Sequence, residues 1–157
     1  MLVVLVSQAD VQGEVATNPP IVLCEQVQPV RAAVFGAPAR YPDHAERAVS
    51  AAEEIVDVVT SRHGDELRFG IGINSGKVVV GSVGGGGRLE FTLIGDAVNV
   101  AARIEQLTKE TGDTVLVTEE TRCMLTGSAI ELEYRGFSTI RGRAGEIKVY
   151  AFPKPGP

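Results

Sequence analysis

The chain has 157 residues, a formal net charge of −5 and 44% hydrophobic residues, of which few are aromatic. This length indicates one domain with an aliphatic core, and the acidic balance argues against a general nucleic-acid or anionic-membrane surface. No apolar run approaches the roughly 20 residues of a membrane span, and Cys24 and Cys123 form no C-x-x-C pair. We therefore expect a cytoplasmic protein from a reduced compartment.

The first part of the chain predicts three short strands, at Leu2–Val6, Ile21–Cys24 and Arg31–Phe35. Their residues are rich in β-branched and other apolar types. Pro19 and Pro20 exclude a helix between the first two strands.

A long helix is predicted at about His44–Arg62, with Asp43 as a candidate N-cap. Its apolar residues recur with the helical period, so one side of the helix should lie on a sheet. These residues are Ala48, Ala52, Ile55, Val56 and Val59. His44 and His63 share no metal-ligand spacing with other residues, and both are expected on the surface.

The stretch Phe69–Arg103 contains the densest pattern in the chain. Gly70 and Gly72 alternate with large side chains, which favours a strand with another element packed tightly against it. Asn74-Ser75-Gly76 is typical of a turn, and a second apolar run begins at Lys77. A tip of four glycines precedes a further strand at Leu89–Ile94.

The next helix is predicted at Ala97–Lys109, with Asp96 as its cap. Val98, Ala101, Ala102 and Leu107 are available for burial. Asn99 and Arg103 are four residues apart, so they share one side of the helix and can reach the same ligand. The alternative is an ordinary solvated helix face.

The C-terminal part predicts a strand at Thr114–Val117, a short helix at Glu119–Leu125 capped by Thr118, and a hairpin of Tyr134–Ile140 with Ile147–Phe152. Strands combined with two long helices indicate an α+β sandwich with an antiparallel-rich sheet and helices on one face.

The run Thr92–Arg103, reading TLIGDAVNVAAR, resembles the signature of class III adenylate/guanylate cyclases. Gly70–Gly76 resembles the strand that this family usually writes G-I-H-x-G, with Asn74 where His is common. The likeness continues through the blocks Ala33–Pro38, Asp43–Ala48, Val117–Thr121 and Gly142-Arg143. It covers about residues 32–152 and implies the ferredoxin-like cyclase catalytic fold. The segment 1–31 is divergent, and 153–157 is a tail.

The resemblance implies a reaction in which the ribose 3′ oxygen attacks the α-phosphorus and pyrophosphate leaves, with Mg²⁺ or Mn²⁺ as cofactor. It assigns Asn99 to the ribose and Arg103 to the transferring phosphate, because a guanidinium donates two parallel hydrogen bonds and stays charged. It places Thr92 against the base and Arg143 near the triphosphate. The alternatives are an ordinary β-forming residue in a strand for Thr92 and an exposed hairpin arginine for Arg143. In the family these sites are shared between two subunits.

The departures from the family concern the metal site. Where the family has a base-contacting Lys and then Gly-Asp, this chain has Glu25, Gln28 and Pro29. Asp10, in the run Ala9–Gly13, faintly resembles the first metal motif, but 22 residues to Ala33 are too few for the helices that normally intervene. We interpret the N-terminal part as truncated or replaced, and we assign no metal ligand.

Three hypotheses follow. The first is a nucleotidyl cyclase, of the adenylate kind, that binds ATP or a related nucleotide and keeps the Asn99–Arg103 half-site. It would act as a homodimer, or as a heterodimer with a cyclase subunit that supplies metal ligands. The second is a catalytically inactive dimerisation or regulatory module, which we favour for this chain by itself. The third is a generic ferredoxin-like ligand-binding domain.

Overall fold

The computed structural model describes residues 2–7, 22–27, 30–36, 41–64, 67–83, 90–127, 131–139 and 145–153, with side chains for 32–36, 41–64, 67–79, 95–127, 131–139 and 145–153. Its strands are β1 (Leu2–Ser7), β2 (Val22–Val27), β3 (Val30–Phe35), β4 (Ile71–Gly76), β5 (Val79–Val83), β6 (Glu90–Ile94), β7 (Val115–Thr118), β8 (Glu133–Thr139) and β9 (Glu146–Ala151). Its helices are α1 (His44–His63), α2 (Asp96–Thr111) and α3 (Glu119–Arg122). In these ranges no helix is long and apolar enough to cross a membrane.

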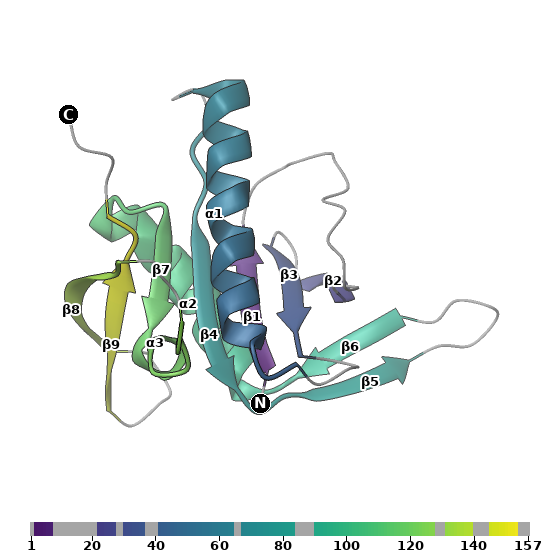
Figure 1. Ribbon diagram of the computed structural model, residues 1–157. Coiled ribbons are helices and arrows are strands. Elements are labelled where there is room, and N and C mark those ends of the chain that lie inside the picture. The colour runs from purple at the N-terminus through teal and green to yellow at the C-terminus, as the bar shows by residue number, and fades with distance from the viewer. Residues whose placement is uncertain are drawn as a thin grey trace.

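The described strands form a seven-stranded sheet in the order β2-β3-β1-β4-β7-β9-β8. The β4–β7 pair is parallel, and the other neighbouring pairs described are antiparallel. β1 lies between β3 and β4, with Val4 opposite both Val34 and Asn74. β5 and β6 pair separately, as a hairpin that extends away from the sheet (Figure 1). The predicted α+β class and C-terminal hairpin are confirmed.

The two long helices cover opposite faces of the sheet, so the prediction that the helices share one face is wrong in this detail. Ile71 and Ile73 of β4 pack in one cluster with α1, whereas Gly72, between them, touches α2. Successive residues of a strand point to opposite faces, so α1 and α2 must lie on different sides. Figure 1 shows α1 in front of β4 and α2 behind it.

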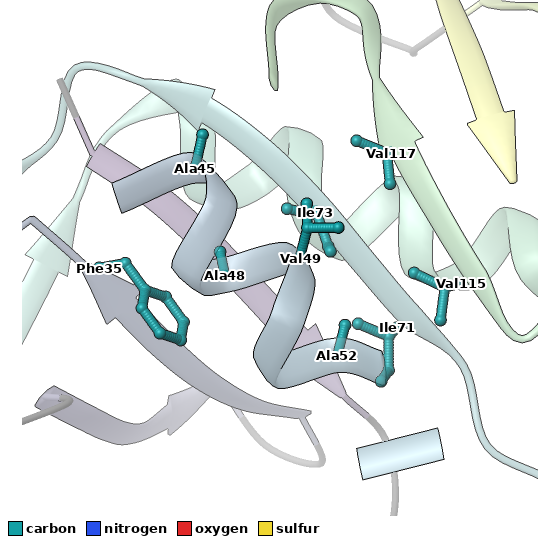
Figure 2. Packing of buried hydrophobic residues seen from close by; sticks show 9 residues of the cluster. All are labelled: Phe35, Ala45, Ala48, Val49, Ala52, Ile71, Ile73, Val115 and Val117. Carbon is teal, nitrogen blue, oxygen red and sulfur yellow. The ribbon is translucent and has the colours of Figure 1, made fainter. Parts of the chain in front are cut away.

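On the α1 face, side chains of helix and sheet fill the space between them. The cluster consists of Phe35, Ala45, Ala48, Val49, Ala52, Ile71, Ile73, Val115 and Val117. Figure 2 shows the residues of α1 directed toward those of β4 and β7. The predicted apolar side of α1 is confirmed, with Val59 buried and Ile55 half-buried. Each large side chain buried in this way contributes about 1.5–3 kcal/mol.

On the other face, α2 packs a different set of side chains against the sheet. One cluster joins Val100, Ile104, Leu116, Ile147, Val149 and Ala151, and a smaller one joins Ala32, Val98 and Ala101. Ala102 and Leu107 are half-buried, so the residues predicted for burial do lie on the packed side of this helix.

Three predicted capping interactions differ in the structure. Asp43 precedes α1, but its carboxylate makes no capping bond and instead accepts a hydrogen bond from Arg47 Nε at 2.8 Å. Gly95, not Asp96, occupies the N-cap position of α2, and Asp96 is the first helical residue. Thr118 precedes α3, which ends at Arg122, but its hydroxyl donates to Asn74. Asp43 and Thr118 thus occupy the predicted N-cap positions, but their side chains form hydrogen bonds elsewhere.

The sequence Asn74-Ser75-Gly76, predicted as a turn, is the end of β4. Its first two residues are buried, and both form side-chain hydrogen bonds with residues far along the chain. Polar, turn-favouring residues remain in a strand here because tertiary hydrogen bonds satisfy them.

Candidate functional site

The candidate site lies on α2, a helix in close contact with the glycine face of β4. The expectation of tight packing at Gly70 and Gly72 is confirmed, because a side chain at either position would overlap α2. A Cβ added at Gly70 would meet Thr108 Oγ1, and one added at Gly72 would meet the backbone oxygen of Ala101 and the backbone nitrogen of Glu105. A Cβ added at Gly76 would lie 2.6 Å from the Cβ of Ala97. The absence of side chains therefore lets the backbones of α2 and β4 approach each other.

Asn99 and Arg103 lie on the side of α2 that points away from β4. Both are exposed, while Ala97, Ala101 and Glu105 face the strand. Because each helical residue turns by about 100°, Asn99 and Arg103 are roughly opposite these contacts and close to one another. No ion pair or hydrogen bond links either side chain to another residue in the described part of the chain.

A buried polar junction holds the first turn of α2 in place. The Asn74 amide donates to the Ala97 carbonyl oxygen at 3.0 Å, and its own oxygen accepts from Thr118 Oγ1 at 2.9 Å. On the opposite face, Ser75 Oγ lies 2.9 Å from Thr121 Oγ1. The sequence analysis missed this junction because it interpreted Asn74 and Ser75 as turn residues.

Glu105 is a second feature that the sequence analysis missed. Its side chain is completely buried under Gly70 and Gly72, and neither carboxylate oxygen has a hydrogen-bond partner among the described residues. Burial raises the pKa of the Glu105 carboxyl, and the charge of Lys109 offsets part of this rise. Its spacing of four residues from Ala101 was the available signal, since it places Glu105 on the packed side of α2.

Residues 31–154 match the model of the adenylate and guanylate cyclase catalytic domain. The chain belongs to this family. It is 40% identical over 86 residues to the terminal-differentiation-specific adenylate cyclase of Dictyostelium discoideum, and 60% identical over 53 residues to an adenylate cyclase of Anabaena cylindrica. These matches cover 54% and 34% of this chain but only 4% and 11% of the relatives, so the chain spans a small part of each.

The cyclase fold is also evident from solved structures. The guanylate cyclase domain of RhGC from Catenaria anguillulae, solved in complex with GTP, superimposes with a TM-score of 0.74. The two sequences are 22% identical, and the superposition covers 97% of this chain and 95% of that domain. The predicted cyclase catalytic fold is thereby confirmed.

Two other residues assigned from the family resemblance are only partly placed. Thr92 lies in β6, opposite Gly81 of β5, two residues before the end of the strand that leads into α2. Its side chain lies outside the described set, and so does all of Arg143. The structure therefore places Asn99 and Arg103 on one exposed side of α2, and the roles of all four residues stay predictions.

The described side chains were also compared with the ligand set of a metal ion. No group of three or more His, Cys, Asp or Glu residues among them is arranged to hold one. Asp10, Gln28 and Pro29 lie outside the described residues, and of Glu25 only the backbone is described. We assign no metal ligand among the described side chains and derive no step through a metal.

His44 is buried, which corrects the expectation that it lies on the surface. Its Nδ1 is 2.7 Å from the Tyr41 carbonyl oxygen, and its Nε2 has no partner among the described residues. His63, at the other end of α1, is exposed as expected.

Proposed function

We propose that this chain is a nucleotidyl cyclase domain of the adenylate kind that supplies one half of a shared nucleotide site. Asn99 orients the ribose, and Arg103 stabilises the negative charge that develops on the transferring phosphate. The observation that supports this most strongly is the exposed Asn99–Arg103 pair on a helix whose other side is packed against glycines. A fixed cation aimed at developing charge is an effective catalytic group, because it needs little reorganisation during the reaction.

ATP is the nucleotide that we propose, because the two curated relatives named above are adenylate cyclases. The Thr92 hydroxyl can donate or accept a hydrogen bond, so it is compatible with either purine. Assays should therefore offer ATP and GTP in parallel. A cytoplasmic location agrees with this substrate and with Cys123, which is exposed and unpaired.

The partner that we propose is a second cyclase subunit that carries the metal-binding carboxylates. With that partner, the Mg²⁺ or Mn²⁺ expected from the family would be held by residues of the other chain. The 3′ oxygen of the ribose then attacks the α-phosphorus, the bond to the pyrophosphate oxygen breaks, and cAMP and pyrophosphate form.

Complementation tests this proposal directly. A full-length cyclase whose own Asn and Arg are replaced by Ala should regain activity when mixed with this chain, at one site per heterodimer. Arg103→Ala should then lower the recovered rate about 100-fold or more, because a methyl group cannot stabilise phosphate charge. Arg62→Ala is the matched control, since Arg62 is also exposed but lies at the far end of α1.

Sedimentation of the mixture reports whether the heterodimer forms. A heterodimer without activity would contradict a functional half-site, and the absence of any heterodimer would contradict the shared site. An equal loss of the recovered cyclase rate in Arg62→Ala and Arg103→Ala would also contradict the role given to Arg103.

A second candidate, an inactive dimerisation or regulatory module, is supported by the sequence, which has Glu25, Gln28 and Pro29 where the family has a base-contacting Lys and then Gly-Asp. It makes a separate prediction for the chain alone. The purified protein should form no cAMP above background with Mg-ATP or Mn-ATP. Activity that survives Asp10→Ala would show that the metal ligands lie elsewhere, and activity that Asp10→Ala abolishes would identify Asp10 as a ligand.

A further inference from the structure

The face of β4 that meets α2 carries only one side chain larger than hydrogen. Every second residue lies on this face: Gly70, just before the strand, and Gly72, Asn74 and Gly76 within it. The three glycines allow close approach along most of the helix. Contacts of this kind resist overlap but have little direction, so they set the distance between helix and strand better than they set the position along it.

Asn74 adds the direction that the glycines lack. It is 2% exposed, and its two hydrogen bonds have opposite polarity: the amide donates to Ala97 in the first turn of α2, and the oxygen accepts from Thr118 of β7. Thr118 itself is fully buried. Thr118 of β7 therefore holds the amide group from one side, and the amide nitrogen donates to the Ala97 carbonyl oxygen of α2 on the other.

The position of Ala97 determines where the exposed pair lies. Asn99 and Arg103 follow Ala97 by two and six residues on the same rigid helix. A shift of α2 by one residue along its axis moves these groups by about 1.5 Å. If the same side of the helix is to stay against β4, the helix must also rotate by about 100°. Such a change would carry the guanidinium away from any phosphate that it is placed to meet.

We propose that Asn74 is a positioning residue, which fixes the register of α2 on β4 and thereby places Asn99 and Arg103. This inference deepens the proposed function and rests on it for its catalytic consequence. Its structural part concerns this chain alone and can be measured without any activity.

The structural test is amide hydrogen exchange of the isolated chain. Asn74→Ala removes both hydrogen bonds, and we expect amides of residues 98–103 to exchange about 10-fold faster relative to those of α1. Ser75→Ala is the matched control. Ser75 is also buried and loses one hydrogen bond, to Thr121. Thr121 reaches the Asn74 amide only through Thr118, at 3.4 Å, and Asn74 keeps both of its own hydrogen bonds in this variant. The α2 amides should therefore stay unchanged relative to α1.

The catalytic test uses the complemented heterodimer described above. Asn74→Ala should lower kcat about 10-fold to 100-fold with little change in KM, because displacement of Arg103 weakens an interaction made in the transition state. Ser75→Ala should change neither constant by more than about twofold. A merely structural role for Asn74 would instead lower the amount of active heterodimer and leave its kcat unchanged.

The outcomes separate the two proposals. Unchanged α2 exchange in Asn74→Ala, or equal effects of the two variants on α2 exchange, would overturn the positioning role. Faster amide exchange confined to α2 in Asn74→Ala would support the role of Asn74 in fixing the register of the helix. If the wild-type heterodimer is inactive at the same time, that role stands and the proposed function is rejected. Should Asn74→Ala fail to fold, Thr118→Val decides by the same criteria, because it removes the donor that holds the Asn74 oxygen while the Asn74 side chain remains.

Discussion

The two faces of β4 are packed in opposite ways, although they belong to the same short strand. Ile71 and Ile73 meet α1 through interdigitating aliphatic side chains, whereas Gly72 brings the backbone of α2 close to the strand. Side-chain packing adjusts to small changes in volume, but backbone contact leaves no flexible atom to move. The α1 face therefore contributes mainly stability, and the α2 face also determines where a helix carrying exposed Asn99 and Arg103 lies.

The largest expected effect comes from adding one methyl group to the α2 face. Gly72→Ala would place its Cβ against the Ala101 oxygen and the Glu105 nitrogen, both backbone atoms. We expect a loss of about 3 kcal/mol or more in the free energy of unfolding, measured by urea titration, because the helix must move. Gly127→Ala is the control, since no atom lies within 4 Å of its added Cβ. A similar, small cost for both variants would contradict the close contact.

The next effect concerns the buried carboxyl on the same face. The pKa of Glu105 is raised by burial, so the folded protein binds this proton more tightly than the unfolded chain does. Stability from this group is present below the ordinary carboxyl pKa and is lost as pH rises through the raised value. Glu105→Gln should therefore increase the free energy of unfolding at pH 7, on the order of 2 kcal/mol, because the amide has no charge to desolvate.

Urea titrations across pH 4 to 8 check this prediction. The gain from Glu105→Gln should shrink toward acid pH, where the wild-type carboxyl is protonated. Glu110→Gln, an exposed change on the same helix, should leave stability nearly constant. A gain that is independent of pH, or a loss at pH 7, would mean that the Glu105 carboxylate is stabilised inside the fold.

The smallest effect is expected on the α1 face. Ile73→Val removes one methylene from a fully buried side chain and should cost about 1 kcal/mol in the free energy of unfolding, with the same urea titration. The adjacent residues 72 and 73 then give a direct comparison of the two faces. If Ile73→Val lowers the free energy of unfolding by more than Gly72→Ala does, the proposed contrast between the two faces is wrong.

Local patterns in the sequence were sufficient for the order of the elements and for the packed sides of the helices. The helical period of α1, the alternation of Gly70 and Gly72 with large residues, and the spacing of Asn99 and Arg103 are all properties of neighbouring residues. Such patterns depend on the geometry of one helix or strand, so they can be interpreted without knowing the rest of the fold. The cyclase resemblance added the chemical roles that spacing alone does not supply.

Only the tertiary structure decided which sheet face each helix covers and what becomes of individual polar residues. Asn74 and Ser75 have a local preference for turns, but partners 23 and 46 residues away hold them in a strand. His44 and Glu105 are polar in sequence, yet the folded chain buries both, and Glu105 lies against the glycines of β4. These outcomes depend on contacts between segments distant in the chain, and the free energy of such contacts exceeds the weak local preferences of single residues.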